Sequence, residues 1–83
     1  LKDMVIRGGE NIYPREIEEF LLEQPEVAEA AVAARPDAAK GEVPVAYLVL
    51  RTPVEAEALR ERCQQALASF KVPRDFRFVE ALP

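Results

Sequence analysis

The residues best suited to bind or process a ligand stand together near the start of the chain: Gly8, Gly9, Glu10 and Asn11. Glycine lacks a Cβ, so two in succession permit backbone conformations and close approaches that other residues forbid. A loop of this kind suits a place that a ligand or another domain must touch. Paired glycines also form plain β-hairpin turns, which need positive φ angles. From the residues alone the hairpin turn is the commoner explanation, and a contact loop is the functional alternative.

Other kinds of chemical site have little support. The glycine segment lacks the G-x-G-x-x-G pattern of dinucleotide-binding loops and the G-K-[ST] ending of Walker loops, so it predicts no phosphate cradle. One cysteine, Cys63, and no histidine leave neither a disulfide framework nor a Cys/His zinc site. Cys63 falls on an apolar helical stripe and is predicted to pack in the core. Glu16, Glu18 and Glu19 suit a helix start and are assigned no catalysis.

The glycines must be held by the elements on either side of them. Short β-prone runs at 4–6 and 11–13 could pair as a hairpin with Gly8 and Gly9 at its tip. A helix is predicted from 14 to 23, because proline suits its first position and apolar residues recur at helical spacing: Ile17, Phe20 and Leu21. Pro25 stops this helix.

The rest of the chain predicts a second hairpin, a second helix and a last strand. Runs rich in Val and Ala at 27–34 and 43–50 are predicted to form a β-hairpin with a long tip. Residues 52–55 have a capping-box pattern with proline at N1, which predicts the start of the second helix. Its apolar stripe comprises Leu59, Cys63, Leu67 and Phe70. Pro73 prevents its continuation, and a short strand is predicted within 76–79.

These elements predict an α+β fold, a small mixed β-sheet with helices packed on it, in the order β-α-β-β-α-β preceded by a short hairpin. One domain over residues 1–83 is sufficient, since no linker divides the chain. A chain of this size buries only about 60 to 65% of its unfolded surface. The core is therefore expected to be modest, and the domain could depend on a partner domain.

The composition opposes two classes of protein. With 49% apolar and 31% charged residues, the chain is typical of a globular domain. Its net charge of −4 opposes a protein that follows nucleic-acid phosphates, since such proteins collect Lys and Arg on one face. No apolar run approaches the roughly 20 residues that span a bilayer, and no signal peptide opens the chain. We expect no nucleic-acid partner, no transmembrane segment and a cytoplasmic location.

Motifs spread over the whole chain resemble the C-terminal domain of one enzyme family. They are Lys2-Asp3-Met4, Arg7 to Glu18 around the glycines, Glu26 to Val32, Pro36-Asp37, Lys40-Gly41-Glu42, Pro44-Val45-Ala46, Phe70 to Arg74, Phe78-Val79 and Leu82-Pro83. The chain resembles the mobile lid of the ATP-dependent acyl-CoA synthetases, or fatty-acid–CoA ligases, of the adenylate-forming (AMP-binding) family. The resemblance implies activation of a carboxylic acid, expected to be a fatty acid, as acyl-AMP and its transfer to coenzyme A.

The resemblance also implies roles for particular residues. Gly8, Gly9, Glu10 and Asn11 match the loop that enters the active site when the lid rotates and lines the channel for the pantetheine thiol. Lys2 matches the hinge about which the lid turns. Lys40 matches a basic position used by some relatives for the phosphates of coenzyme A. Two further cations, Lys71 and Arg74, could anchor the nucleotide end, although a helix dipole explains them sufficiently.

The remaining parts of such an enzyme are expected elsewhere. The resemblance implies that the adenylation lysine follows soon after the position of Leu82 and Pro83, so no catalytic residue is assigned within the chain. ATP, Mg and coenzyme A are expected to serve the full enzyme, with the N-terminal adenylation domain as partner, and the fragment alone is expected to be inactive. The isolated domain could self-associate through surfaces that its partner covers. The alternative is a stand-alone, non-catalytic binding module that keeps the lid fold.

Overall fold

The computed structural model describes residues 4–7 and 9–83, so the predictions for Lys2 and Gly8 lie outside the described residues. The elements are β1 (Val5–Arg7), β2 (Glu10–Ile12), α1 (Pro14–Leu22), β3 (Val27–Asp37), β4 (Gly41–Leu50), α2 (Ala56–Ala66), the 3-10 turn η1 (Ser69–Lys71) and β5 (Asp75–Phe78). The predicted α+β fold is confirmed. The N-terminal hairpin is also confirmed, although each strand is displaced by one residue from the predicted range.

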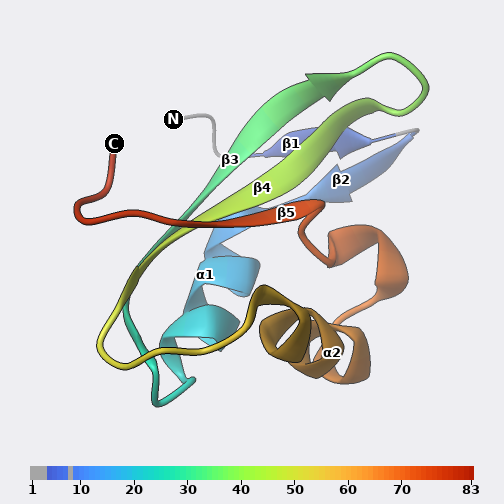
Figure 1. The fold of residues 1–83 in the computed structure, drawn as a ribbon. Helices are drawn as coiled ribbons and strands as arrows, with labels where there is room; N and C mark the ends of the chain where they lie inside the picture. Colours follow the sequence, from blue (N-terminus) through green and yellow to red (C-terminus); the bar gives the residue numbers. More distant parts are fainter. Residues whose placement is uncertain (1–3, 8) are drawn as a thin grey trace.

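Strand β4 is the centre of a five-stranded mixed sheet. Along one edge it pairs with β3 in antiparallel register from Gly41 to Leu50. Its other edge is shared: β1 pairs antiparallel at Gly41, and β5 pairs parallel with residues 45–48. Both helices lie on the same face of this sheet (Figure 1). The β4–α2–β5 crossover therefore brings the C-terminal strand alongside the middle of the chain.

The β3–β4 hairpin has longer strands and a shorter tip than predicted, since only residues 38–40 lie between the strands. The first strand of this hairpin, predicted to end at 34, continues through Pro36, which pairs opposite Glu42 within the ladder. The strand tolerates proline because β3 is an edge strand. The amide of Val32 points outward, where it donates to Glu18 Oε2 at 2.8 Å. Pro36 lies four residues further along the same strand, so its backbone nitrogen also points away from β4. Its missing N–H therefore removes no ladder hydrogen bond.

The predicted start and end of the second helix are wrong. Helix α2 begins at Ala56 behind Glu55, which makes no side-chain cap, and ends at Ala66. The backbone amides of Arg51 and Thr52 donate instead to the carbonyl of Glu26, at 2.6 and 3.4 Å, which holds this segment in a turn beside the α1–β3 connection. The tertiary hydrogen bonds therefore override the local capping pattern. The last two residues of the predicted stripe, Leu67 and Phe70, lie beyond the helix.

The core lies between the two helices and the covered face of the sheet. Its fully buried side chains are Ile12, Ile17, Leu21, Val32, Ala46, Leu48, Leu59 and Cys63. The predicted core position of Cys63 is confirmed, and burial raises the pKa of its thiol to about 11, so it is protonated at neutral pH. No helix within residues 4–7 and 9–83 is long and apolar enough to cross a membrane.

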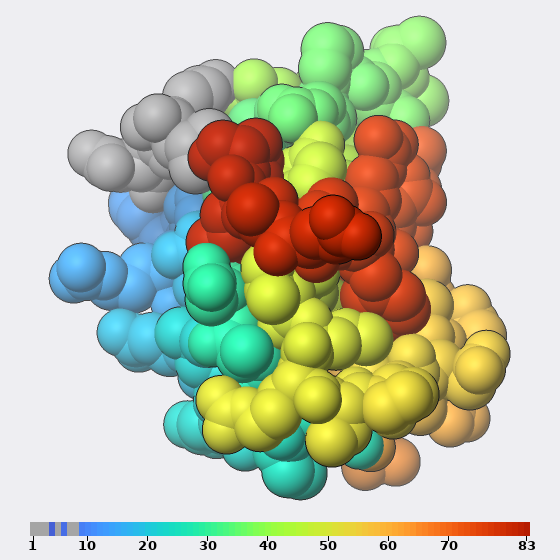
Figure 2. Space-filling model, turned by 60° about the vertical axis from the view of Figure 1, so that its left-hand side comes forward, coloured from blue at the N-terminus to red at the C-terminus, as the bar shows by residue number. Residues whose placement is uncertain are grey.

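The C-terminal segment after β5 crosses one surface of the domain. In the space-filling view this red segment lies at the centre of the face, against the yellow-green residues of β4 (Figure 2). The amide of Val79 donates to the carbonyl of Leu48 at 2.9 Å, which continues the β4–β5 ladder by one bond. The chain therefore remains attached to the sheet after its last strand.

A bidentate ion pair between Arg62 and Glu26 connects helix α2 to the α1–β3 connection. Arg62 donates from Nη1 and Nη2 to the two carboxylate oxygens of Glu26, at 2.8 and 3.0 Å, and from Nη1 to Gln24 Oε1 at 3.2 Å. Paired N–H donors facing a carboxylate form one of the strongest side-chain contacts. The hydrogen bonds from Arg62 lower the pKa of Glu26 from 4.5 to about 2.

We expect Arg62→Met to lower the free energy of unfolding at pH 7, and the loss to fade in acid. The folded-state pKa of Glu26 lies below its unfolded value, so the ion pair stabilises the fold above about pH 4.5 and is lost as the pH falls toward 2. Urea unfolding of both proteins at pH 7 and at pH 2 measures this difference. Arg15→Met, at an exposed position of α1, is the control. A difference that is independent of pH would contradict the assignment.

Candidate functional site

The hairpin of β1 and β2 ends in an exposed glycine tip, which comprises Gly9, Glu10 and Asn11, at one end of the sheet. Arg7 pairs with Glu10 across it, and Gly9 has a φ of +85° in the turn. A left-handed backbone of this kind favours glycine, so the turn requirement predicted for Gly9 is confirmed. A Cβ added to Gly9 would meet no atom within 4 Å, and Glu10 and Asn11 are exposed. The tip therefore presents backbone and two polar side chains to whatever approaches it.

Gly41 and Glu42 fix this hairpin against β4. Gly41 pairs with Arg7, has a φ of +85°, and would place an added Cβ 3.3 Å from the carbonyl oxygen of Ile6. The amide of Ile6 donates to Glu42 Oε1 at 2.9 Å. The close approach and the hydrogen bond set the glycine tip and the turn that carries Lys40 at the same end of the sheet (Figure 1).

Replacing Gly41 with alanine should therefore destabilise the domain more than the same change at Gly9. Both sites have the same positive φ, which costs a non-glycine residue about 1 to 2 kcal/mol. Only Gly41→Ala also presses on backbone, at Ile6, so we expect about 2 kcal/mol for Gly41→Ala and about 1 kcal/mol for Gly9→Ala. Urea unfolding followed by circular dichroism gives both values, and equal losses would show that the close approach carries no cost.

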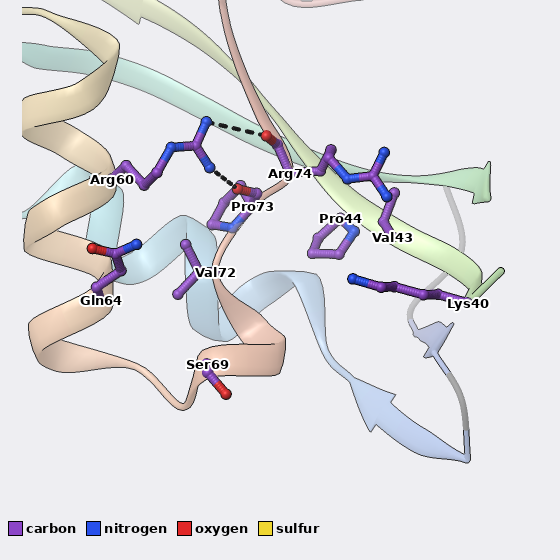
Figure 3. A pocket seen from close by; sticks show the side chains of 9 residues that line it. All are labelled: Lys40, Val43, Pro44, Arg60, Gln64, Ser69, Val72, Pro73 and Arg74. Atoms are coloured by element: carbon purple, nitrogen blue, oxygen red, sulfur yellow. Dashed lines mark hydrogen bonds between the residues drawn. The ribbon is translucent and has the colours of Figure 1, made fainter.

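A pocket of about 250 Å³ lies beside the Lys40 turn, between β4, α2 and the η1–β5 connection. Its lining comprises Lys40, Val43, Pro44, Arg60, Gln64, Ser69, Val72, Pro73 and Arg74. Figure 3 shows Arg60 and Gln64 entering from α2 on one side, while the ammonium of Lys40 reaches from the opposite side toward Pro44. The lining contains three cations and no carboxylate, which suits an anionic group.

The three cations differ in how they are held. Arg60 donates to the carbonyls of Pro73 and Arg74 at 3.0 and 3.1 Å, and its guanidinium lies 5.1 Å from the ring centroid of Phe76. Arg74 donates from Nη2 to Asp37 at 2.6 Å. Lys40 is exposed and forms no ion pair within the described part of the chain. Lys40 is therefore the cation with the greatest freedom to meet a ligand.

The helix-dipole explanation predicted for Lys71 and Arg74 is wrong, because neither residue lies at the C-terminal end of α2. Helix α2 ends at Ala66, and only the three-residue η1 precedes these cations. Each cation instead has a carboxylate partner far away in sequence: Lys71 Nζ lies 2.8 Å from Glu16, and Arg74 lies 2.6 Å from Asp37. The amide of Arg74 also donates to the carbonyl of Pro44 at 2.8 Å, which places its side chain beside the Lys40 turn.

The structure brings together some predicted site residues and adds others. Gly9, Glu10 and Asn11 lie on the hairpin tip, and Lys40 lies on the neighbouring turn and in the pocket. Sequence analysis missed Arg60 and Gln64, whose spacing of four residues puts them on one face of α2. The sequence shows this spacing, but it does not show which other elements this face of α2 contacts. Among the described residues, no group of three or more His, Cys, Asp or Glu side chains could hold a metal ion.

Comparison with protein families gives one matching model. The model described as "AMP-binding enzyme C-terminal domain" matches residues 16–83, which is most of the chain. Among curated proteins, the chain is 54% identical over 81 residues to 2-succinylbenzoate–CoA ligase of Bacillus licheniformis, covering 98% of this chain and 17% of that protein. It is 48% identical over 84 residues to sulfoacetate–CoA ligase of Cupriavidus necator, covering 99% and 16%.

Solved structures agree with this similarity. A double mutant of o-succinylbenzoate CoA synthetase from Bacillus subtilis, bound with its product analogue OSB-NCoA, superposes with a TM-score of 0.96 at 48% identity. The match covers 100% of this chain and 17% of that one. The same synthetase in complex with ATP and magnesium ion gives a TM-score of 0.91 at 49% identity, covering 98% and 17%. The chain thus spans about a sixth of the length of these relatives.

Proposed function

Because the chain belongs to the AMP-binding enzyme C-terminal domain family, we propose that it is the lid of an ATP-dependent acid–thiol ligase. In this proposal the remainder of the enzyme, an N-terminal adenylation domain, forms an acyl adenylate from a carboxylic acid and ATP. The lid then rotates about Lys2 and completes the site in which the thiol of coenzyme A takes the acyl group. Closing such a site also keeps water from the reactive adenylate.

The observation that carries the proposal is the common location of the glycine tip and the cationic pocket. Gly9 offers backbone without a side chain, which suits a narrow channel for the pantetheine arm. Lys40, on the adjoining turn, shares its pocket with Arg60 and Arg74, which suits the phosphates at the other end of coenzyme A. One end of the sheet thus offers one feature suited to the pantetheine arm of coenzyme A and another suited to its phosphates.

The acyl substrate is proposed only as a carboxylic acid. The fatty acid expected from the sequence finds no support in the curated relatives compared above, which are ligases for 2-succinylbenzoate and sulfoacetate. ATP and coenzyme A are proposed as substrates of the complete enzyme and Mg as its metal cofactor, in line with the ATP, magnesium ion and product analogue bound in the Bacillus subtilis structures. Their use is compatible with the cytoplasmic location expected from the sequence, and self-association of the isolated domain stays a prediction.

Lys40→Ala should raise the KM for coenzyme A up to about fivefold in the complete ligase, because an exposed ion pair contributes up to about 1 kcal/mol. Pyrophosphate released in a single turnover without coenzyme A should be unchanged, because the adenylate forms before the thiol binds. Steady-state thioester formation at varied coenzyme A measures the first effect. Arg51→Ala removes an exposed cation after β4 and is the control. An unchanged KM would remove Lys40 from the proposed site.

A stand-alone binding module is the second candidate function, since the lid fold itself does not require a catalytic partner. The gene that encodes this chain distinguishes the ligase lid from the stand-alone module. An adenylation domain encoded upstream in the same reading frame, with a Gly-Lys motif shortly downstream of Pro83, supports the ligase. A reading frame without them, together with no thioester formed from ATP, coenzyme A and a panel of carboxylic acids, supports the module.

A further inference from the structure

Asp37 contacts the guanidinium of Arg74 and the backbone amide of Lys40, two of the residues that line the pocket. Its Oδ1 accepts a hydrogen bond from Arg74 Nη2 at 2.6 Å. Its Oδ2 accepts the backbone amides of Ala39 and Lys40, at 3.1 and 2.9 Å. Asp37 is the last residue of β3, so one carboxylate joins the end of a strand, the turn that follows it and the segment before β5.

This carboxylate is well shielded and stays charged. The side chain of Asp37 is 16% exposed, whereas that of Arg74 is 47% exposed. The hydrogen bond from Arg74 lowers the pKa of Asp37 below its usual range, against the opposing effect of desolvation. Asp37 is not among the residues that line the pocket, so its carboxylate does not occupy the space where an anion would sit.

The two contacts restrict different motions. Hydrogen bonds that backbone amides donate to a preceding side-chain carboxylate fix a turn, so Asp37 limits the directions in which the exposed Lys40 side chain can leave that turn. A guanidinium is a planar fork of five N–H donors, so holding one end of Arg74 orients the others without using them up. Ordering both groups before a ligand arrives lowers the entropy lost on binding.

We infer that Asp37 is a positioning residue for anion binding, which holds Lys40 and Arg74 in the arrangement that accepts a phosphate group of coenzyme A. The inference rests on the proposed function and deepens it, because it names the group that sets the geometry of the cationic pocket. Asp37 itself contacts no substrate. It acts through the turn and through the guanidinium of Arg74.

The test uses two substitutions of Asp37 in the complete ligase. Asp37→Asn keeps an oxygen that can accept the amides of Ala39 and Lys40, but loses the charge that holds Arg74. Asp37→Ala loses both functions. We expect the KM for coenzyme A to rise about three- to fivefold for Asp37→Asn and further for Asp37→Ala, with the KM for ATP and pyrophosphate release unchanged. Asp75→Asn, which removes a carboxylate 3.6 Å from Arg77 on β5, is the matched control.

A double substitution separates positioning from other effects. If Asp37 acts through Arg74, adding Asp37→Asn to Arg74→Ala should raise the KM for coenzyme A no further. An additional increase, a decrease in KM on removing the carboxylate, or an equal effect on the KM for ATP would overturn the inference. If Lys40→Ala and Arg74→Ala both leave the KM unchanged, the phosphate site fails together with the inference. If they raise it and Asp37→Asn does not, the phosphate site stands and the inference alone is wrong.

Discussion

Thioester formation should collapse by about a hundredfold or more when Gly9 is replaced with leucine in the complete ligase, while pyrophosphate release survives. The expected loss is large because a leucine side chain at the hairpin tip would project into the proposed thiol channel and displace the pantetheine arm from the acyl carbon. In the proposed function, adenylation precedes entry of the thiol and uses the other orientation of the lid. A coupled assay that follows pyrophosphate and thioester separately measures both half-reactions.

Gly9→Ala is the matched control for this experiment. Alanine and leucine suffer the same backbone cost at a φ of +85°, and neither side chain's Cβ meets an atom within 4 Å in the domain itself. A difference between the two variants therefore reports the bulk that enters the channel and not a loss of folding. We expect alanine to retain much of the thioester activity. If leucine leaves both half-reactions intact, Gly9 is only a turn residue and the channel assignment is wrong.

Leu59→Ala should destabilise the domain by about 2 to 5 kcal/mol, the usual cost of emptying a buried leucine site. Leu59 is fully buried in α2 against the sheet. A domain of 83 residues has a total stability of only about 4 to 12 kcal/mol, so this one change removes a large share of it. Urea unfolding followed by circular dichroism measures the loss.

Leu22→Ala is the control for Leu59→Ala, because Leu22 is 48% exposed at the end of α1 and its removal leaves no buried cavity. We expect it to cost less than about 1 kcal/mol. The consequence of Leu59→Ala for function follows from its neighbours. Arg60 and Gln64 reach the pocket from the same helix, so loosening α2 should also weaken the binding of coenzyme A. Similar losses for the two leucines would contradict the assignment of Leu59 to the core.

Local sequence determined most elements and the residues inside them. Pro14 at the first helical position, with Ile17 and Leu21 on one face, predicts α1 within one residue of its observed end. The glycine tip was predicted because only glycine adopts positive φ at little cost, and Gly9 does so. These features depend on spacing and backbone sterics over a few residues, so they can be predicted from the sequence alone. The resemblance carried by the same motifs also identified the family, as the match over residues 16–83 confirms.

Tertiary structure alone decided which distant groups meet. The carbonyl of Glu26 accepts hydrogen bonds from the amides of Arg51 and Thr52, and α2 begins at Ala56, beyond its local capping signal. Lys40, Arg60 and Arg74 become neighbours only because β4 fixes the turn at one end and the α2 crossover returns the chain beside it. Asp37 gains its partner Arg74 in the same way, across 37 positions. Sequence spacing fixes which side chains share a face of one element, whereas strand register and crossover packing fix which faces come together.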